Sequence, residues 1–143
     1  MAKKIRISLV KSGVSVIAEL CEDLAPKSCQ LLFKKLPLKG EAIHARWGGN
    51  EIWMDLPPLG LTGYENETIF PSPGEILLVQ KATGVCDIAI FYGKGWCFGP
   101  SGFTPGNHVA TIIGIGNLNE FAKACNKVLL EGSQQLLIEN AEK

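Results

Sequence analysis

The residues best suited to chemistry lie in one short stretch, residues 43–57, which reads IHARWGGNEIWMDLP. Arg46 can present a guanidinium group to a carboxylate or a carbonyl, because its fork of donors suits bidentate binding. Glu51 can serve as a base, and Trp53 can form a flat wall beside both. We therefore expect a cleft around Arg46 that binds a small carboxylate or amide metabolite, with Arg46 and Glu51 as candidate catalytic residues.

This stretch has the pattern of a β-hairpin. Gly48-Gly49 suits a two-residue turn, because both central positions of such a turn can need a positive φ. Arg46 then lies opposite Glu51, where the two can also form a simple cross-strand ion pair worth at most about 1 kcal/mol. A three-residue turn would mix the two faces, whereas the register is set by the buried face. With the two-residue turn, one face carries His44, Arg46, Glu51, Trp53 and Asp55, and the apolar face carries Ile43, Ala45, Trp47, Ile52, Met54 and Leu56.

A second group of candidates surrounds a glycine-rich loop, residues 93–106, which reads GKGWCFGPSGFTPG. The aromatic residues of such a loop either fold back as small plugs or line a pocket. We assign Trp96, together with Tyr92 and Trp53, to the wall of the ligand site. His108 is a further candidate ligand-binding residue; the alternative is a strand histidine satisfied by local hydrogen bonds.

Other site chemistries have weaker support. His44 and His108 share no helical spacing, so the sequence predicts no metal site, and nothing in it calls for a cofactor. Either histidine can line the pocket. Cys97 lies in the glycine-rich loop and should be more accessible than Cys86, so it is either a nucleophile paired with a histidine or a buried, inert thiol.

The composition bounds the class of protein. The chain has 143 residues, of which 46% are hydrophobic, as expected for one domain (1–143) with a packed core. Lys plus Arg and Asp plus Glu number 14 each, so there is no electrostatic case for binding nucleic acid or an anionic membrane surface. Five cysteines without a C-x-x-C pair indicate reduced thiols and a cytoplasmic location. We expect no signal peptide and no membrane span.

Hydrophobic periodicity predicts the elements that position these residues. Residues 4–10 and 14–20 alternate as an antiparallel hairpin, and a helix should begin at Pro26. A second helix should be capped by Asn117, with Glu120 completing a capping box, and should end at Gly132. Further strands are expected at 75–80, 86–92, 108–116 and 135–139, with a link at 81–84 and a long, functional loop at 57–73. The pattern predicts a mainly β fold, a closed antiparallel barrel of about eight strands with two covering helices.

Several motifs of the chain resemble the cyclophilins. Ala25-Pro26-Lys27-Ser28 is similar to the start of the first cyclophilin helix, and His44-Ala45-Arg46 resembles the strand that holds the catalytic arginine of that family. The segment from His108 to Gly132 resembles the last strand and helix. More closely, Pro73-Gly74-Glu75-Ile76, Gly106-Asn107-His108 and Leu130-Glu131-Gly132-Ser133-Gln134 look like a family of small, uncharacterised bacterial cyclophilin-like proteins. The resemblance spans nearly the whole chain and implies a cyclophilin-like barrel.

The cyclophilin motifs for prolyl isomerisation are largely replaced. Met54-Asp55-Leu56-Pro57 stands where cyclophilins have glutamine-glycine-glycine-aspartate, while His108 matches the histidine of that family. Three functions remain open on this evidence. The first is binding, with or without turnover, of a small molecule; the second is a non-catalytic subunit that pairs with itself or with an enzyme through its aromatic loops; the third is peptidyl-prolyl cis-trans isomerisation.

Overall fold

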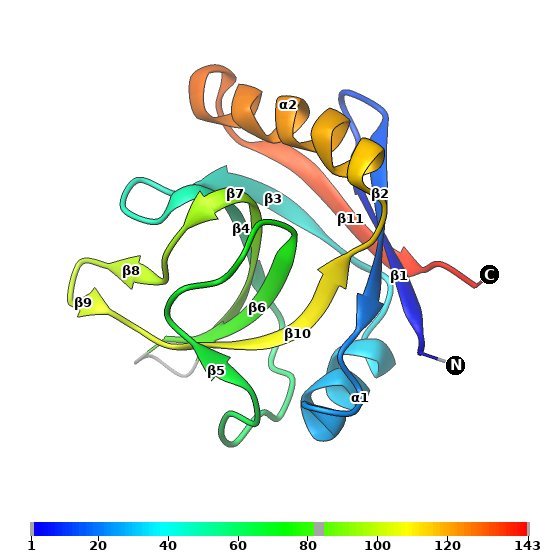
Figure 1. The fold of residues 1–143 in the computed structure, drawn as a ribbon, viewed down its shortest axis with the longest axis vertical. Helices are drawn as coiled ribbons and strands as arrows, with labels where there is room; N and C mark the ends of the chain where they lie inside the picture. The colour runs from blue at the N-terminus through cyan, green and yellow to red at the C-terminus, as the bar shows by residue number, and fades with distance from the viewer. Residues whose placement is uncertain (1, 82–84, 143) are drawn as a thin grey trace.

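A computed structural model describes residues 2–81 and 85–142. Within them, eight antiparallel strands follow one another in the order β2-β1-β11-β3-β4-β7-β6-β10, and β10 pairs back with β2 to close a barrel (Figure 1). The short β5 (Glu67–Thr68) pairs with one end of β10, and β8 (Phe98–Gly99) with β9 (Gly102–Phe103) forms a separate small hairpin. The barrel strands are β1 (Lys4–Leu9), β2 (Val14–Leu20), β3 (Leu38–His44), β4 (Gly49–Leu56), β6 (Glu75–Gln80), β7 (Cys86–Gly95), β10 (Gly106–Ile112) and β11 (Gln134–Asn140).

The inside of the barrel is the main hydrophobic core. Along β1, Ile5, Ile7 and Leu9 are fully buried while the residues between them are partly exposed, as a strand with one buried face requires. Strands β6 and β7 differ, because both of their faces are buried near the middle of the sheet. The predicted barrel of about eight strands with two helices is confirmed. Of the predicted link at residues 81–84, residues 82–84 lie outside the described residues.

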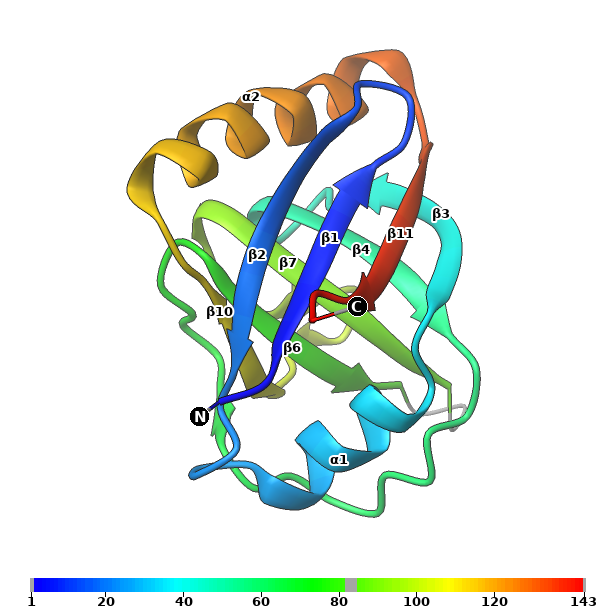
Figure 2. The ribbon, with the colours of Figure 1, turned by 90° about the vertical axis from the view of Figure 1, so that its right-hand side faces the viewer.

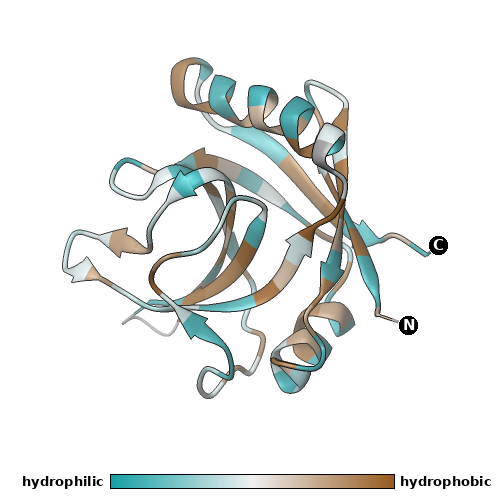
Figure 3. Ribbon diagram, viewed as in Figure 1, coloured by the Kyte–Doolittle hydropathy of each residue, from teal (hydrophilic) through white to brown (hydrophobic). Residues whose placement is uncertain are grey.

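The two helices lie at opposite ends of the barrel (Figures 1 and 2). Helix α1 (Pro26–Lys34) begins at Pro26 as predicted and buries Cys29 and Leu32. Helix α2 (Ile115–Glu131) alternates hydrophilic and hydrophobic turns (Figure 3) and buries Phe121 and Cys125 against the sheet. Neither helix, nor any other among the described residues, is long and apolar enough to cross a bilayer.

The predicted start of α2 is wrong by three residues. The helix begins at Ile115, and its N-cap is Gly114 with φ +89°, a conformation that favours glycine. Asn117 therefore lies inside the first turn, and no side chain caps the helix. The capping-box pattern of Asn117 and Glu120 was a false signal, whereas Gly132 ends the helix at φ +99° as predicted.

The register predicted for the central hairpin is also wrong. Gly49 has a positive φ and Gly48 does not, so the pair cannot form the two-residue turn in which both do. His44 pairs with Ile52 instead of Trp53, and residues 45–48 make a longer loop. This shift mixes the two faces of β3, because His44 points into the barrel and Ile43 points outward. Strand β4 keeps its predicted sorting, with Ile52, Met54 and Leu56 buried inside.

The long loop between β4 and β6 is anchored by one buried side chain. Asn107 Oδ1 accepts hydrogen bonds from the backbone N–H groups of Glu65 (3.2 Å) and Asn66 (2.9 Å), and Asn107 Nδ2 donates to Ser28 Oγ (2.5 Å). The carboxylate of Glu65 in turn accepts from the backbone N–H and the hydroxyl of Ser28, which caps the start of α1. These hydrogen bonds lower the pKa of Glu65 below its usual value. The loop is therefore fixed between α1 and β10.

Candidate functional site

A second, smaller apolar cluster lies on the outside of the barrel. Adjacent strands β4, β7 and β6 point alternate side chains outward, so Trp53, Ala89 and Leu77 form a row across them. Phe91 and Cys97 are buried in the same cluster, against which Trp53 packs. Another segment must pack over this outer face to bury it, and here that segment is the chain after β7, which we call the cover.

The chain from β7 to β9 folds over this outer face. Its backbone is held by a hydrogen bond from Trp96 N to Gly48 O (3.0 Å) and another from Cys97 N to Ile69 O (2.9 Å). Between this cover, the β3–β4 loop and the sheet lies a cleft of about 580 Å³. Its lining is mostly apolar, with a few polar groups, as is common for small-molecule sites. The lining includes Ile43, Arg46, Trp47, Glu51, Trp53, Val79, Lys81, Asp87, Phe98, Pro100 and Ser101.

Glu51 is the most unusual group of the cleft. The residue is only 9% exposed, and a Cβ atom at Gly48 would overlap Glu51 Oε1, so the β3–β4 loop closes directly over the carboxyl group. Burial raises the pKa of Glu51 to about 8, and the charge of Asp87 adds to this shift. At neutral pH the carboxyl group is therefore mainly protonated, so it can donate a hydrogen bond or a proton.

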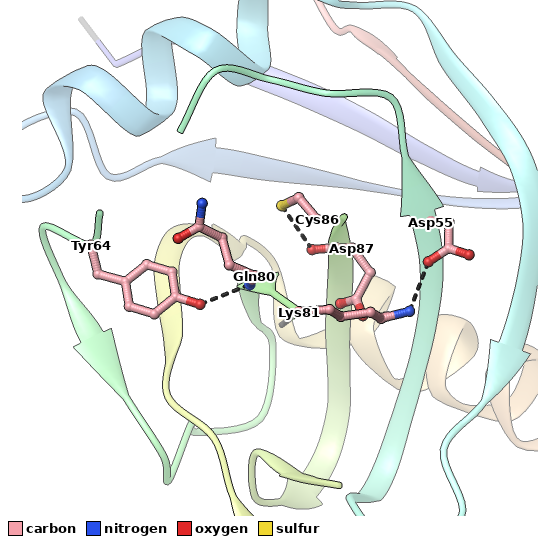
Figure 4. Close-up of polar contacts among 6 residues, drawn as sticks. All are labelled: Asp55, Tyr64, Gln80, Lys81, Cys86 and Asp87. Carbon is pink, nitrogen blue, oxygen red and sulfur yellow. Dashed lines mark hydrogen bonds and ion pairs between the residues drawn. The ribbon is translucent and has the colours of Figure 1, made fainter. Parts of the chain in front are cut away.

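Asp87 forms the second acidic group of the cleft. Burial raises its pKa to about 6, although the nearby charge of Lys81 opposes the shift. Lys81 Nζ lies 3.5 Å from Asp87 Oδ2 and 2.9 Å from Asp55 Oδ1, and Figure 4 shows its side chain reaching between the two carboxylates. The same ammonium lies 4.4 Å from the ring centroid of Trp53. Asp87 is thus ionised at pH 7.5 while Glu51 stays mainly protonated.

The comparisons with known proteins place the chain in a family. Residues 7–139 match DUF3830, a protein family of unknown function. The chain belongs to the DUF3830 family. A search of curated proteins finds no match.

Two solved structures share the fold of this DUF3830 protein. McbB, solved in complex with tryptophan, superposes with a TM-score of 0.75 at 22% identity over 97% of this chain. The chain covers 45% of McbB, less than half of that protein's length. The hypothetical protein AF2241 from Archaeoglobus fulgidus superposes with a TM-score of 0.62 at 20% identity, over 98% of this chain and 95% of its own. At these identities the likeness shows the fold alone.

The structure brings three of the predicted site residues of the DUF3830 chain together. Arg46, Glu51 and Trp53 all line the cleft. The expected ion pair between Arg46 and Glu51 is not formed, and among the described residues Arg46 has no salt bridge. Trp47, predicted in the core, is 51% exposed and lines the cleft instead, because the longer turn reverses its direction.

Three other predicted ligand-binding residues lie elsewhere. Tyr92 points into the barrel, where its hydroxyl lies 2.6 Å from His44 Nε2, so this pair forms a buried polar contact on the opposite side of the sheet. Trp96 is 41% exposed and is not part of the lining of the cleft. His108 Nε2 lies 2.8 Å from Thr111 Oγ1, in the hydrogen-bonded strand arrangement that was the alternative for it. His44 is also part of the lining of the cleft, although its side chain is buried and contacts Tyr92 inside the barrel.

The structure favours the buried-thiol alternative for Cys97 of this DUF3830 chain. Cys97 is 5% exposed despite its position in a glycine-rich loop, and burial raises its pKa to about 12. A thiol with this pKa carries almost no thiolate at neutral pH. No group of three or more His, Cys, Asp and Glu side chains in the described part of the chain could hold a metal ion.

The sequence reasoning missed two residues of the cleft, Lys81 and Asp87. Asp87 did leave a signal, because it is the only charged residue in the apolar strand sequence CDIAIFY. A carboxylate in such a run must either face a partner or a cleft. Lys81 left no signal in the sequence, since a lysine at the end of a predicted strand is ordinary. Its role follows only from the pairing of β6 with β7.

Proposed function

We propose that the cleft binds a small organic molecule that carries a carboxylate or amide group and a flat apolar part. The observation that carries this proposal is the buried Glu51 carboxyl group in a cleft whose lining also includes Trp53 and Arg46, which has no salt bridge to any described residue. A few polar groups in the wall of a mostly apolar cleft are what fixes the orientation of a small ligand.

Each of the three residues has a separate part in this proposal. Arg46 anchors the ligand carboxylate through charge-assisted hydrogen bonds. Protonated Glu51 donates a hydrogen bond to the same carboxylate or to an amide oxygen, and it is the group from which a proton would be transferred if the ligand is converted. Trp53 stacks against the flat part of the ligand. Glu51, with a pKa of about 8, is thus assigned as an acid where the sequence suggested a base.

The tryptophan complex of McbB suggests the first ligands to test. McbB was solved in complex with tryptophan, and the cleft of this chain combines aromatic walls with an arginine, groups that suit an aromatic amino acid. Tryptophan, indole-3-propionate and N-acetyltryptophanamide present a zwitterion, a carboxylate and an amide on similar rings. At about 100 times its dissociation constant a ligand should stabilise the protein by about 2.7 kcal/mol, which a thermal-shift assay resolves readily.

Arg46→Ala should weaken binding of indole-3-propionate by about tenfold or more, because it removes charge-assisted hydrogen bonds worth about 1.5–3 kcal/mol. Isothermal titration calorimetry at pH 7 measures the change. Arg6→Ala is the matched control, since Arg6 lies on β1 outside the cleft. Equal affinity of the wild type and Arg46→Ala would remove Arg46 from the site.

We also propose that the barrel is of the cyclophilin-like kind. The motifs around Pro26 and His108 and the order of the elements support this relationship. Prolyl isomerase activity is the least supported of the three functions, because the segments that form the proline pocket of cyclophilins are replaced here.

A second candidate function is association with another protein chain through exposed aromatic side chains. Phe70, Phe98 and Phe103 pack edge to face, with centroids 5.6 Å and 5.1 Å apart, yet are 64%, 38% and 55% exposed. An exposed aromatic cluster of this kind favours an interface, here with a second copy of the chain.

This candidate predicts self-association that depends on Phe103. Light scattering at increasing protein concentration should show dimers for the wild type, and Phe103→Ser should be monomeric because it removes the ring that joins the other two. Leu130→Ser is the matched control, since Leu130 is exposed on α2, away from the cluster. A monomeric wild type would rule out this self-association.

A further inference from the structure

The ammonium group of Lys81 occupies one corner of the cleft. It faces two carboxylates, those of Asp55 and Asp87, and the ring of Trp53. An aromatic face beside carboxylates is the arrangement by which proteins bind amines and other organic cations. Lys81 itself therefore shows that this corner accepts a primary ammonium group.

The two carboxylates hold Lys81 unequally. Asp55 is the closer partner at 2.9 Å, and its side chain is 61% exposed. Asp87 is 3.5 Å away, and its side chain is only 9% exposed. Among the described residues Lys81 is the only cation within 4 Å of the Asp87 carboxylate. The buried carboxylate thus has the poorer partner, although a buried charge costs more to leave uncompensated.

The charges in this corner do not balance. Asp55 and Asp87 carry two negative charges at pH 7.5, where Asp87 is above its pKa of about 6. Lys81 supplies one positive charge, and Glu51 is mainly protonated and adds little. One negative charge is therefore left over, in a partly buried place where Coulomb interactions are screened less than in water.

We propose that Asp87 and Trp53 form a cation subsite of the cleft, in which the primary ammonium group of the ligand replaces Lys81 as the partner of Asp87. This inference rests on the proposed function, and it narrows the ligand to a small amino-acid-like zwitterion with its carboxylate at Arg46. Lys81 keeps its shorter ion pair with the exposed Asp55 when the ligand ammonium takes its place beside Asp87. The exchange also brings a second cation to the corner and balances its charge.

The subsite can be tested without knowing the natural ligand. Lys81→Ala removes the internal ammonium, so n-butylammonium should bind this variant at least tenfold more tightly than it binds the wild type at pH 7.5 in low salt. The double variant Lys81→Ala/Asp87→Asn should lose this gain. 1-Butanol is the neutral control probe, and Lys94→Ala is the control variant, because Lys94 is exposed on β7. Calorimetry gives the dissociation constants.

A gain that persists in the double variant, or that 1-butanol reproduces, would overturn the cation subsite, as would no gain at all in Lys81→Ala. Tryptophan and indole-3-propionate, which differ in the ammonium group, provide a second test in the single variant Asp87→Asn. This variant should bind tryptophan at least tenfold more weakly than the wild type does, and its affinity for indole-3-propionate should stay within twofold of the wild-type value. Equal weakening of both would also overturn the subsite. If the wild type bound none of the carboxylates while butylammonium still bound Lys81→Ala as expected, the proposed function would be overturned and the cation subsite would stand.

Discussion

Glu51→Gln is expected to stabilise the protein by a few kcal/mol at pH 8 and to change its stability little at pH 5. Glutamine has nearly the shape of a protonated glutamic acid but cannot ionise. Burial raises the pKa of Glu51 from its usual 4.5 to about 8, so the wild-type protein holds a proton that the unfolded chain releases. The variant removes the free-energy cost of this difference.

The direction of the pH dependence follows from the proton balance. Below pH 4.5 the carboxyl group is protonated in both the folded and the unfolded state, and it does not affect the equilibrium. Between about pH 4.5 and 8 the unfolded chain releases the proton and the folded chain keeps it, so rising pH favours unfolding by about 1.4 kcal/mol per pH unit. The free energy of unfolding stops falling when Glu51 also ionises in the folded protein, above its folded-state pKa. Asp87, with its pKa raised to about 6, acts in the same direction between roughly pH 4 and 6.

Urea unfolding at pH 5, 6.5 and 8, followed by tryptophan fluorescence, measures the effect. The free energy of unfolding of the wild type should fall across this range more steeply than that of Glu51→Gln. Glu67→Gln is the matched control, because Glu67 is exposed on β5, and its curve should run parallel to that of the wild type. Parallel curves for the wild type and Glu51→Gln would mean that the folded protein does not hold this proton.

The strands and helices were accessible from sequence because each shows its period locally. The alternation in β1 and β2 and the proline at the start of α1 report on residues a few positions apart. The start of α2 was not accessible in this way. The sequence there contains both a capping-box pattern at Asn117 and a glycine at Gly114. The helix starts after the glycine, whose φ is +89°, three residues earlier than the capping box predicts. Such choices depend on how the preceding strand ends.

The central hairpin shows why a site is harder to predict than a fold. Its register depends on the φ of one glycine, and sequence does not show which of Gly48 and Gly49 takes the positive value. The longer turn moves His44 into the barrel with Tyr92 and brings Trp47 to the cleft. Predictions on β4 survived because Ile52, Met54 and Leu56 determine its direction whatever the turn does.

The cleft itself depends on contacts between distant segments. Lys81 and Asp87 are close in the sequence, but their contact with Trp53 requires β4, β7 and β6 to be neighbours. The sequence contains these residues without indicating that order. Trp96 was assigned to the cleft for its type, yet the cover places the buried Cys97 and the exposed Phe98 there instead.

Asn107→Ala is expected to lower the free energy of unfolding by about 3 kcal/mol, or roughly 10 °C in melting temperature. Asn107 is fully buried, and its amide joins β10 to the long loop and to α1. Alanine leaves the N–H groups of Glu65 and Asn66 without their acceptor and leaves a small cavity beside Ser28. Each such loss costs about 1–3 kcal/mol, and the three occur at one point.

The consequence should reach the cleft, because the same loop supports its cover through the hydrogen bond from Cys97 N to Ile69 O. Hydrogen exchange should show the amides of Asn66 and Cys97 losing protection together in Asn107→Ala. Asn119→Ala is the matched control, since Asn119 is exposed on α2, and it should change stability by less than about 0.5 kcal/mol. A stable Asn107→Ala variant with unchanged exchange at Cys97 would show that the cover of the cleft stands without the loop. The Gly106-Asn107-His108 motif would then stabilise the region around β10 without affecting the cleft.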